Sequence, residues 1–333
     1  FLSFYPYFWR WAPMRQKGIN YAKYGYIFSI PFVLTFLVFS LYPLIYTTVI
    51  GFTDLRGLMR TSIHILDDPL QNFKLILNNP TFQKSLSNTF VIWIMNFIPQ
   101  LSLALLLTAW FTNSTLRVKG QGAFKILIYM PNIITAATIA ILFYGLFGYP
   151  KGPVNDLLMK MGFIDGPINF HLRRWGARGI VAFIQFWMWY GHTMIILIAG
   201  VLGINPTLFE AAEIDGASAT QIFFRITLPR LRTIILYTLV TNMIGGLQMF
   251  DISKLFLLGG PDNATITASV FIYNQAFSGS YLYNRAAAAS MIMFLIIMVL
   301  SSFLFFLLRD KDEIRMRKRI RALNRAAKQE GQL

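Results

Sequence analysis

Cysteine is absent from this 333-residue chain, which excludes disulfides and thiolate metal sites. Histidine occurs only three times, at His64, His171 and His192, and these positions do not have the spacing of a metal-ligand set. The patterns GxxxxGK[ST], GxSxG and HExxH are also missing, so the sequence has no phosphate-binding loop, nucleophile elbow or zinc-protease motif. The chain therefore shows no recognisable catalytic constellation.

Charge is also scarce. Charged residues make up 13% of the chain, against about 25% in a typical soluble domain. Hydrophobic residues make up 56%, and the mean hydropathy is +0.53. Much of the surface must therefore face something other than water.

Six apolar stretches are long enough to cross a bilayer as helices, which takes about 20 residues each. They lie near 24–50, 86–112, 126–147, 179–203, 233–257 and 286–308. A transmembrane barrel would need alternating strands of about 10 residues, and these are not seen. The sequence predicts an all-α polytopic membrane protein with six transmembrane helices.

The connecting segments differ in their content of Lys and Arg. The first set carries 19 basic residues and the second carries 10. The first set comprises 1–23, 113–125, 204–232 and 309–333, and the second comprises 51–85, 148–178 and 258–285. The positive-inside rule places the first set, and with it both termini, in the cytoplasm. The excess depends on the segment 309–333, which alone carries nine basic residues.

Two end segments flank the predicted transmembrane domain, 24–308. The aromatic and basic segment 1–23 is typical of a chain lying at lipid headgroups, and the basic tail 309–333 favours contact with anionic membrane lipids. An ordinary positive-inside anchor is the alternative for the tail. The net charge of +16 does not indicate nucleic acid binding, because no recognised binding motif accompanies the basic run.

Polar side chains inside the predicted spans are costly in lipid and therefore informative. They are Asn96, Gln100, Gln185, His192, Asn242 and Gln248. Hydrogen bonds between helices would explain any one of them, whereas together they suggest a polar path. Asp251 and Lys254 are three residues apart, a spacing at which they can pair.

The run "FWMWYGH" at 186–192 adds an aromatic cluster to the fourth span. Trp and Tyr near a membrane interface usually form a belt. Flat aromatic faces also offer apolar contact to the C–H faces of sugar rings. Both interpretations remain open for this run.

The segment 204–232 is the clearest polar interruption between two spans. Asn205 can cap a helix with Pro206 at its first position, and Gly216 suits a left-handed helix terminator. The stretch "ASATQIFFRI" predicts a second short helix that Pro229 interrupts. The sequence therefore predicts a cytoplasmic helix–turn–helix, which suits docking in a groove of a partner.

This segment also carries a specific pattern: E-A-A, three residues, Gly, nine residues, then I-x-L-P. The residues that match are Glu210, Ala211, Ala212, Gly216, Ile226, Leu228 and Pro229. The pattern resembles the signature of the permease subunits of binding-protein-dependent ABC importers. With "LQMFD" at 247–251, "GGPDNAT" at 259–265 and "YNQAF" after it, the chain most resembles the carbohydrate branch, the maltose- and glycerol-phosphate-type permeases.

The resemblance implies the type I permease fold in a bacterial inner membrane. It implies that 205–222 is a coupling helix inserted in a cleft of a cytoplasmic ATPase, with Glu210 as an ionic contact and Glu213 and Asp215 beside it. Two such ATPases would bind ATP and Mg, with no cofactor in this chain. The other implied partners are an extracytoplasmic solute-binding protein and a second, different permease chain.

The resemblance also implies a carbohydrate substrate, an oligosaccharide, moved by alternating access. Candidate path residues lie on the fourth and fifth spans: Trp189, Tyr190, His192, Asn242, Gly245, Gly246, Gln248 and Met249. The cluster of Arg173, Arg174 and Arg178 would favour an anionic sugar or an acidic face of the binding protein, or would simply reflect a basic chain.

Two other functions compete with this one. An ion-coupled secondary transporter or channel acting alone would leave the 204–232 segment unexplained and would have one intramembrane acidic residue, Asp251, for a relay. A membrane enzyme would need an acid–base or metal constellation that the sequence does not contain.

Overall fold

The computed structural model describes residues 22–57, 63–113, 119–279 and 281–308, together with 320 and 322. The predicted end segments 1–23 and 309–333 lie almost wholly outside these residues. Regular structure in the described ranges is helical, apart from one isolated antiparallel bridge between Thr53 and Ile65. The chain divides into two units, 1–49 and 50–333.

The first unit contains the first predicted span. It consists of α1 (Ala22–Phe36), a π-helical turn at Leu37–Leu41 and the start of α2 (Tyr42–Ile50). A proline has no N–H to donate and its ring clashes with the carbonyl four residues back. The π-turn stands just before Pro43, and its last bond runs from the Tyr42 amide to the Leu37 carbonyl. The span continues through the proline as one helical segment, Lys23–Ile50.

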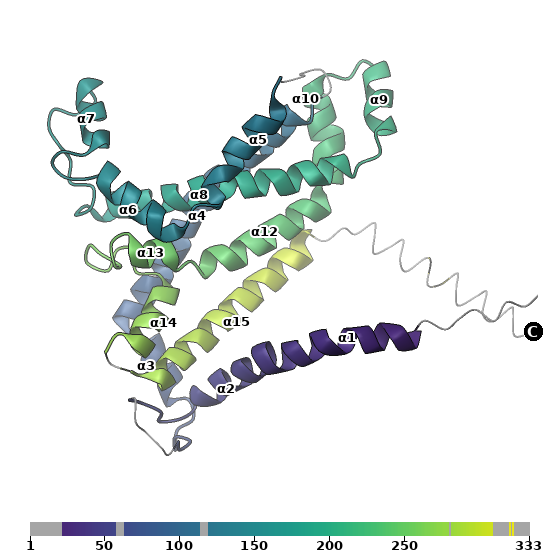
Figure 1. Cartoon of the computed structure of the whole chain (residues 1–333). Helices are drawn as coiled ribbons and strands as arrows, with labels where there is room; N and C mark the ends of the chain where they lie inside the picture. Colours follow the sequence, from purple (N-terminus) through teal and green to yellow (C-terminus); the bar gives the residue numbers. More distant parts are fainter. Residues whose placement is uncertain are drawn as a thin grey trace, which may run out of the picture. The chain divides into compact units, whose positions relative to one another are not determined.

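In the second unit the spans are α4 (Pro80–Phe111), α8 (Arg174–Leu202), α12 (Arg232–Leu247) continued by α13 (Asp251–Leu255), and α15 (Tyr283–Leu308). Each is long and apolar enough to cross a membrane. Helix α4 packs along α8, and α12 lies beside α15 (Figure 1). These spans confirm the predicted positions to within six residues at each end.

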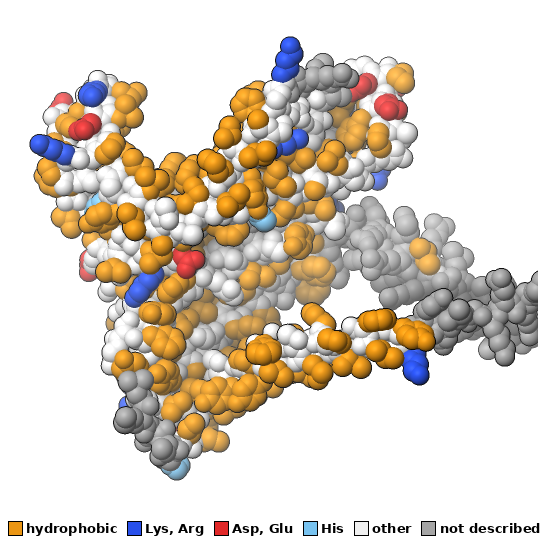
Figure 2. Space-filling view, in the orientation of Figure 1, with side chains coloured by type: hydrophobic (Ala, Val, Ile, Leu, Met, Phe, Trp, Pro, Cys, Tyr) orange, Lys and Arg blue, Asp and Glu red, His pale blue; other side chains and the backbone are white. Residues whose placement is uncertain are grey.

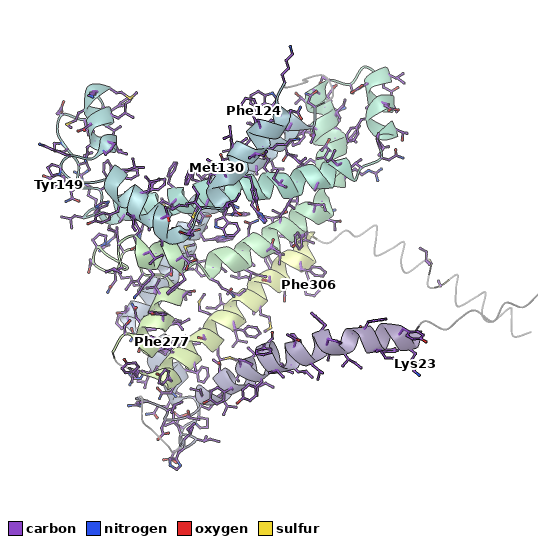
Figure 3. All side chains as sticks on the ribbon, in the orientation of Figure 1. Lys23, Phe124, Met130, Tyr149, Phe277 and Phe306 are labelled. Atoms are coloured by element: carbon purple, nitrogen blue, oxygen red, sulfur yellow. The ribbon has the colours of Figure 1, made fainter. Side chains whose placement is uncertain are left out.

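The third predicted span differs from the prediction of a single helix over 126–147. It consists of α5 (Gln121–Tyr129), a 3₁₀ turn at Met130–Asn132 and α6 (Ala136–Leu146), with a bend of 90°. Pro131 lies in the turn, and Thr135 starts α6 by accepting a hydrogen bond from the Thr138 amide at 3.3 Å. The proline removes a donor and the new cap begins a second helix. The bend is seen near Met130 in Figure 3.

Short helices connect the spans. Helices α3 (Gln71–Leu77) and α14 (Ala268–Phe277) pack at the start of α15. Helix α7 (Pro153–Lys160) follows α6, while α9 (Thr207–Ile214) and α10 (Ala219–Ile222) follow α8. Charged side chains on the visible face of this unit lie on α7, near α9 and near α13 (Figure 2).

Candidate functional site

A cavity of about 330 Å³ lies between α4, α8 and the junction of α12 with α13. Its lining combines amide and hydroxyl groups with aromatic rings. The lining residues are Asn96, Gln100, Gln185, Trp189, His192, Ile196, Thr241, Asn242, Gly245, Gly246, Gln248, Met249, Phe250 and Asp251. Seven of the eight predicted path residues are therefore brought together, and Tyr190 is the exception.

Helical periodicity explains which residues meet here. On α8 the lining positions are 185, 189, 192 and 196, and on α4 they are 96 and 100. Positions three or four residues apart share one face of a helix. On α12 the lining positions are 241, 242, 245 and 246, and residues 248 and 249 follow directly after its end at Leu247. Asn242 and Gln248 thus both face the cavity, although they are six residues apart.

Tyr190 points elsewhere. Its ring lies 5.5 Å from that of Phe186, at an interplanar angle of 30°. The neighbouring Trp189 is 41% exposed and meets the His192 ring edge-on, with the centroids 5.6 Å apart. The wall of α8 therefore offers one indole and one imidazole to the cavity, while Tyr190 packs on Phe186 in a tilted ring pair.

Gln100 fixes the polar side of the cavity. Its Nε2 donates at 2.8 Å to both Thr193 Oγ1 on α8 and Asn242 Oδ1 on α12. The Asn242 amide in turn donates to the Thr238 carbonyl at 2.8 Å. One side chain thus joins three spans and sets the orientation of Asn242.

Several lining residues were not predicted as path residues. Asn96, Gln100, Gln185 and Asp251 were recognised only as polar groups within spans, and Ile196, Thr241 and Phe250 were not singled out. The spacing of 185, 189, 192 and 196 along one helix face was the signal available in the sequence for α8. No comparable signal marks Phe250, which follows the end of α12.

Asp251 is the one acidic or basic residue, histidine apart, among the lining residues. The spacing of Asp251 and Lys254 allows an ion pair, but the structure gives the lysine other partners. Lys254 Nζ donates to Asn274 Oδ1 at 2.7 Å and lies 4.9 Å from the centre of the Tyr273 ring. The lysine therefore contacts two residues of α14. The spacing of three residues between Asp251 and Lys254 could not show this competing partner.

The helix–turn–helix after α8 is a second candidate site. Asn205 Oδ1 accepts from the Thr207 amide at 3.1 Å, and α9 begins at Thr207, one residue later than predicted. Gly216 has a φ of +77°. Around it the Ala217 amide bonds the Ala212 carbonyl at 2.9 Å and the Gly216 amide bonds the Glu213 carbonyl at 3.0 Å. This pair of bonds is a Schellman motif, so Gly216 ends α9 as the sequence predicted.

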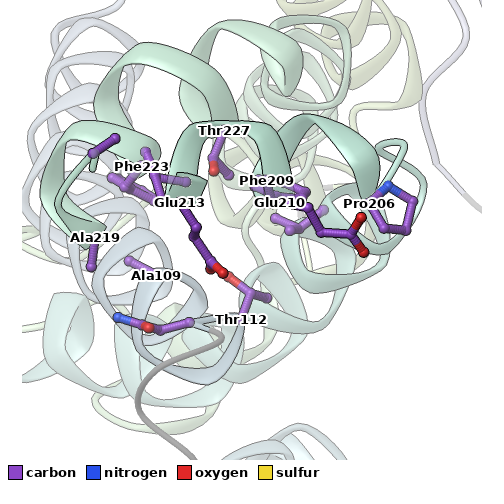
Figure 4. A pocket seen from close by; sticks show the side chains of 13 residues that line it. Ala109, Thr112, Pro206, Phe209, Glu210, Glu213, Ala219, Phe223 and Thr227 are labelled. Atoms are coloured by element: carbon purple, nitrogen blue, oxygen red, sulfur yellow. The ribbon is translucent and has the colours of Figure 1, made fainter. Parts of the chain in front are cut away.

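The surface of α9 is exposed and of mixed character. Ile214 is 86% exposed, and Glu210, Ala211, Glu213 and Asp215 are exposed with it. Behind this surface a pocket of about 300 Å³ separates α9 from the end of α4. Figure 4 shows Glu213 directed across this pocket toward Thr112, which directly follows α4, whereas Glu210 points toward the Pro206 side.

Pro229 does not interrupt the helix that follows α10, contrary to the prediction. Helix α10 continues through a π-turn at Phe223–Thr227 into Leu228–Arg230. The Leu228 amide bonds the Phe223 carbonyl, five residues back, just ahead of the proline. As at Pro43, the wider turn precedes the residue that cannot donate.

The chain was compared with known proteins. Residues 78–318 match the model of the family described as "Binding-protein-dependent transport system inner membrane component". The chain belongs to this family. The protein is therefore a permease, a multi-pass component of the inner membrane, and its fold is that of the type I ABC importer permeases.

Individual relatives cover most of the permease. It is 31% identical to the lactose transport system permease protein LacF of Rhizobium radiobacter over 87% of this chain and 96% of that protein. It is 32% identical to the arabinooligosaccharides transport system permease protein AraP of Bacillus subtilis, over 86% and 89%. It also resembles a solved bacterial alginate ABC transporter in complex with an alginate pentasaccharide-bound periplasmic protein. The TM-score is 0.70 and the sequence identity 24%, over 86% of this chain and 94% of that chain.

At the opposite end of α8 from α9, the permease carries a cluster of charges. The Asp262 carboxylate lies 3.2 Å from Lys84 Nζ on α4 and 3.1 Å from an Arg174 nitrogen on α8. The hydrogen bond and charge of Lys84, followed by those of Arg174, hold the pKa of Asp262 below its ordinary value. Arg178, deeper on α8, donates to Asn88 Oδ1 and to the Ala264 carbonyl. Two of the three clustered arginines are thus occupied within the chain.

Proposed function

We propose that the permease takes up an oligosaccharide as the transmembrane subunit of an ATP-driven ABC importer. The observation that carries the proposal is the coincidence of the E-A-A…G…I-x-L-P residues with a capped, exposed helix–turn–helix. The cavity supports the substrate class, because it combines an exposed indole with several amides, the groups that suit C–H faces and hydroxyls of sugars. The names of the relatives, which include lactose and arabinooligosaccharide permeases, agree with this class.

In this proposal residues 205–222 are the coupling element, and they dock in a cleft of a cytoplasmic ATPase subunit. Ile214 supplies an apolar anchor, while Glu210, with Glu213 and Asp215 nearby, supplies the charge around it. Ala211, Ala212 and Gly216 shape and end the helix, and Ile226, Leu228 and Pro229 join it to α12. ATP and Mg would bind to two such ATPases and not to this chain.

The rest of the assembly follows from the same proposal. A second, different permease chain would pair with this one, and an extracytoplasmic binding protein would deliver the solute. The α9 end would face the cytoplasm, together with both chain termini and a basic tail at 309–333 in contact with lipid headgroups. The transmembrane domain would extend over 24–308. Closure of the ATPases would then switch the cavity between its two openings.

The structure gives an anionic substrate no support from the arginine cluster. Arg174 bonds Asp262, and Arg178 bonds Asn88 and the Ala264 carbonyl. The cavity itself is lined by a carboxylate, Asp251, and by no lysine or arginine. The proposed substrate is therefore an oligosaccharide that need not carry an acidic group.

The experiment compares two substitutions of exposed apolar side chains by the same acid. Ile214→Asp changes a residue of α9 that is 86% exposed, and Phe163→Asp changes one that is 69% exposed after α7. Neither breaks a core, so both variants should fold. Ile214→Asp should reduce the ATPase subunit that co-purifies by about tenfold or more, as loss of an interface anchor does. Phe163→Asp should retain it.

Equal co-purification with both variants would contradict the coupling role. Uptake of labelled arabinotriose by the purified chain in liposomes, without ATPase and ATP, would instead support the secondary transporter. Binding-protein-stimulated ATP hydrolysis in the reconstituted complex is the positive result expected for the importer.

A further inference from the structure

The loop between α13 and α14, residues 256–267, is held by side chains from two other spans. It contains three non-glycine residues with positive φ, Leu258, Asp262 and Asn263. Such a backbone persists only where its surroundings impose it. In this permease the surroundings are polar groups of α4 and α8.

Asn88 on α4 is the centre of these contacts. It is fully buried, and its Nδ2 donates at 2.7 Å to the Asn263 carbonyl and at 2.9 Å to the Ile266 carbonyl. Its Oδ1 accepts from Arg178 on α8, which also donates to the Ala264 carbonyl at 3.0 Å. One amide therefore fixes both ends of the 263–266 stretch and links it to two spans.

The far end of the loop reaches the cavity wall. Helix α12 ends at Leu247, so the carbonyls of Gln248 and Met249 lie just beyond it. Thr267 Oγ1 donates to the Met249 carbonyl at 2.8 Å, and Ser269 Oγ donates to the Gln248 carbonyl at 3.1 Å. Gln248 and Met249 both line the cavity, as do Phe250 and Asp251 after them.

We propose that Asn88 and Thr267 are positioning residues of the solute path. Asn88 fixes the loop against α4 and α8, and Thr267 transfers that fixed position to the wall segment Gln248–Asp251. Neither side chain lines the cavity, so both act through the backbone of the wall. The inference rests on the proposed function in taking this cavity as the solute path.

Thr265 provides a matched control. Thr265 and Thr267 are both fully buried, and both donate a hydroxyl to a carbonyl, at 2.7 and 2.8 Å. Thr265 bonds Gly260 within the loop, whereas Thr267 bonds Met249 in the wall. Replacement of each by Val removes a hydroxyl with little change of shape.

The absence of cysteine makes the wall directly measurable. A single cysteine is placed at Gln248, which is exposed to the cavity, and its reaction rate with a soluble methanethiosulfonate reagent is followed in the full chain. A second series carries the cysteine at Gln185, on the α8 side of the same cavity. Reaction rate reports the local freedom and access of the labelled backbone.

Thr267→Val should change the rate at position 248 by about three- to tenfold, the equilibrium effect of one hydrogen bond. Thr265→Val should leave that rate within about twofold, and neither should alter the rate at position 185. Because Thr267 also caps α14, Thr267→Ser, which keeps both bonds, should restore the original rate.

Asn88→Asp tests whether the contacts of Asn88 with the loop, away from the cavity, affect the wall. The aspartate still accepts from Arg178 but loses both amide donors to the loop, so the rate at position 248 should change as with Thr267→Val. Equal effects of the Thr265 and Thr267 variants, or an unchanged rate in Asn88→Asp, would overturn the proposal. The labelling uses no solute and no ATPase. A negative labelling result would therefore leave the co-purification result valid, and a negative co-purification result would leave the labelling result valid.

Discussion

Gly245 and Gly246 are adjacent residues of α12 with opposite surroundings. A Cβ built on Gly246 would lie 2.1 Å from Trp93 Cδ1 and 2.6 Å from its Nε1, whereas a Cβ on Gly245 meets nothing within 4 Å. Gly246 therefore permits the close approach of α12 to α4, and Gly245 leaves space in the cavity. Both line the cavity, but only one is needed for packing.

Alanine at each position should separate these roles. Gly246→Ala should lower the free energy of unfolding by about 1–3 kcal/mol, because the Trp93 ring must move. Gly245→Ala should be neutral or stabilising by up to about 1 kcal/mol, from the better helix propensity of alanine. Thermal unfolding of the two purified variants in detergent checks this, and equal melting temperatures would contradict the packing role of Gly246.

At this scale the sequence showed which residues are unusual but not where they point. The polar positions within spans were identifiable because polar groups in lipid are costly, and seven predicted path residues do meet. Tyr190 is adjacent to Trp189, but successive helical residues face different directions, and only Trp189 lines the cavity. Lys254 had two partners within reach, and the choice of Asn274 depends on the position of α14, which no local pattern encodes.

Among the elements, the segment between α7 and α8 contacts the bundle through His171, next to Phe170, which packs on Phe147. The His171 ring stacks on Tyr144 of α6 at 4.6 Å and meets Phe256, next to α13, edge-on at 5.4 Å. Its Nε2 is buried without a hydrogen-bond partner. Burial holds the pKa of His171 below its ordinary value, so the packed form is the neutral imidazole.

The packing of neutral His171 predicts that part of the free energy of unfolding is lost in acid. The folded state binds the proton less readily than the unfolded state, so stability is greatest above the ordinary histidine pKa of about 6.5 and falls as the pH drops below it. Replacement of His171 by Phe keeps a ring between Tyr144 and Phe256 but cannot be protonated. Its melting temperature should vary less between pH 7 and pH 5 than that of the parent, and parallel pH profiles would contradict this role.

The helices also show what periodicity and length can predict. Five spans were located to within six residues because a long apolar run has few alternatives in a membrane. The third was not predicted as broken: Pro131 was noted, but a proline in a span can be absorbed or can end the helix. Pro43 and Pro229 follow π-turns and do not end their helices, and no residue pattern distinguished these cases in advance.

For the whole molecule, orientation in the membrane remains a prediction from charge. The nine basic residues of 309–333 carry the asymmetry, and they lie beyond the described residues. The family assignment and the helix order are independent of that count. The cysteine-free chain again allows a direct test.

A single cysteine at Asp215, beside Gly216, should react with a membrane-impermeant maleimide only after the inner membrane is opened. A cysteine at Asn263, beside Asp262, should react in intact spheroplasts. Both positions are exposed, so access to the reagent depends on the side of the membrane. The reverse pattern would place α9 outside and would remove the basis for docking to a cytoplasmic ATPase.

The π-turn at Phe223–Thr227 affects the direction in which the exposed surface of α9 faces relative to α12. Its amide bonds reach five residues back, so it holds one residue more than an α-helical turn. Each α-helical residue rotates the chain by about 100° and advances it by about 1.5 Å. Loss of one residue here would turn α10, and α9 with it, by about a quarter of a revolution relative to α12. The number of residues in the π-turn therefore fixes the direction in which Ile214 and its exposed neighbours on α9 face. A single deletion in the turn would change that direction without altering any side chain on α9.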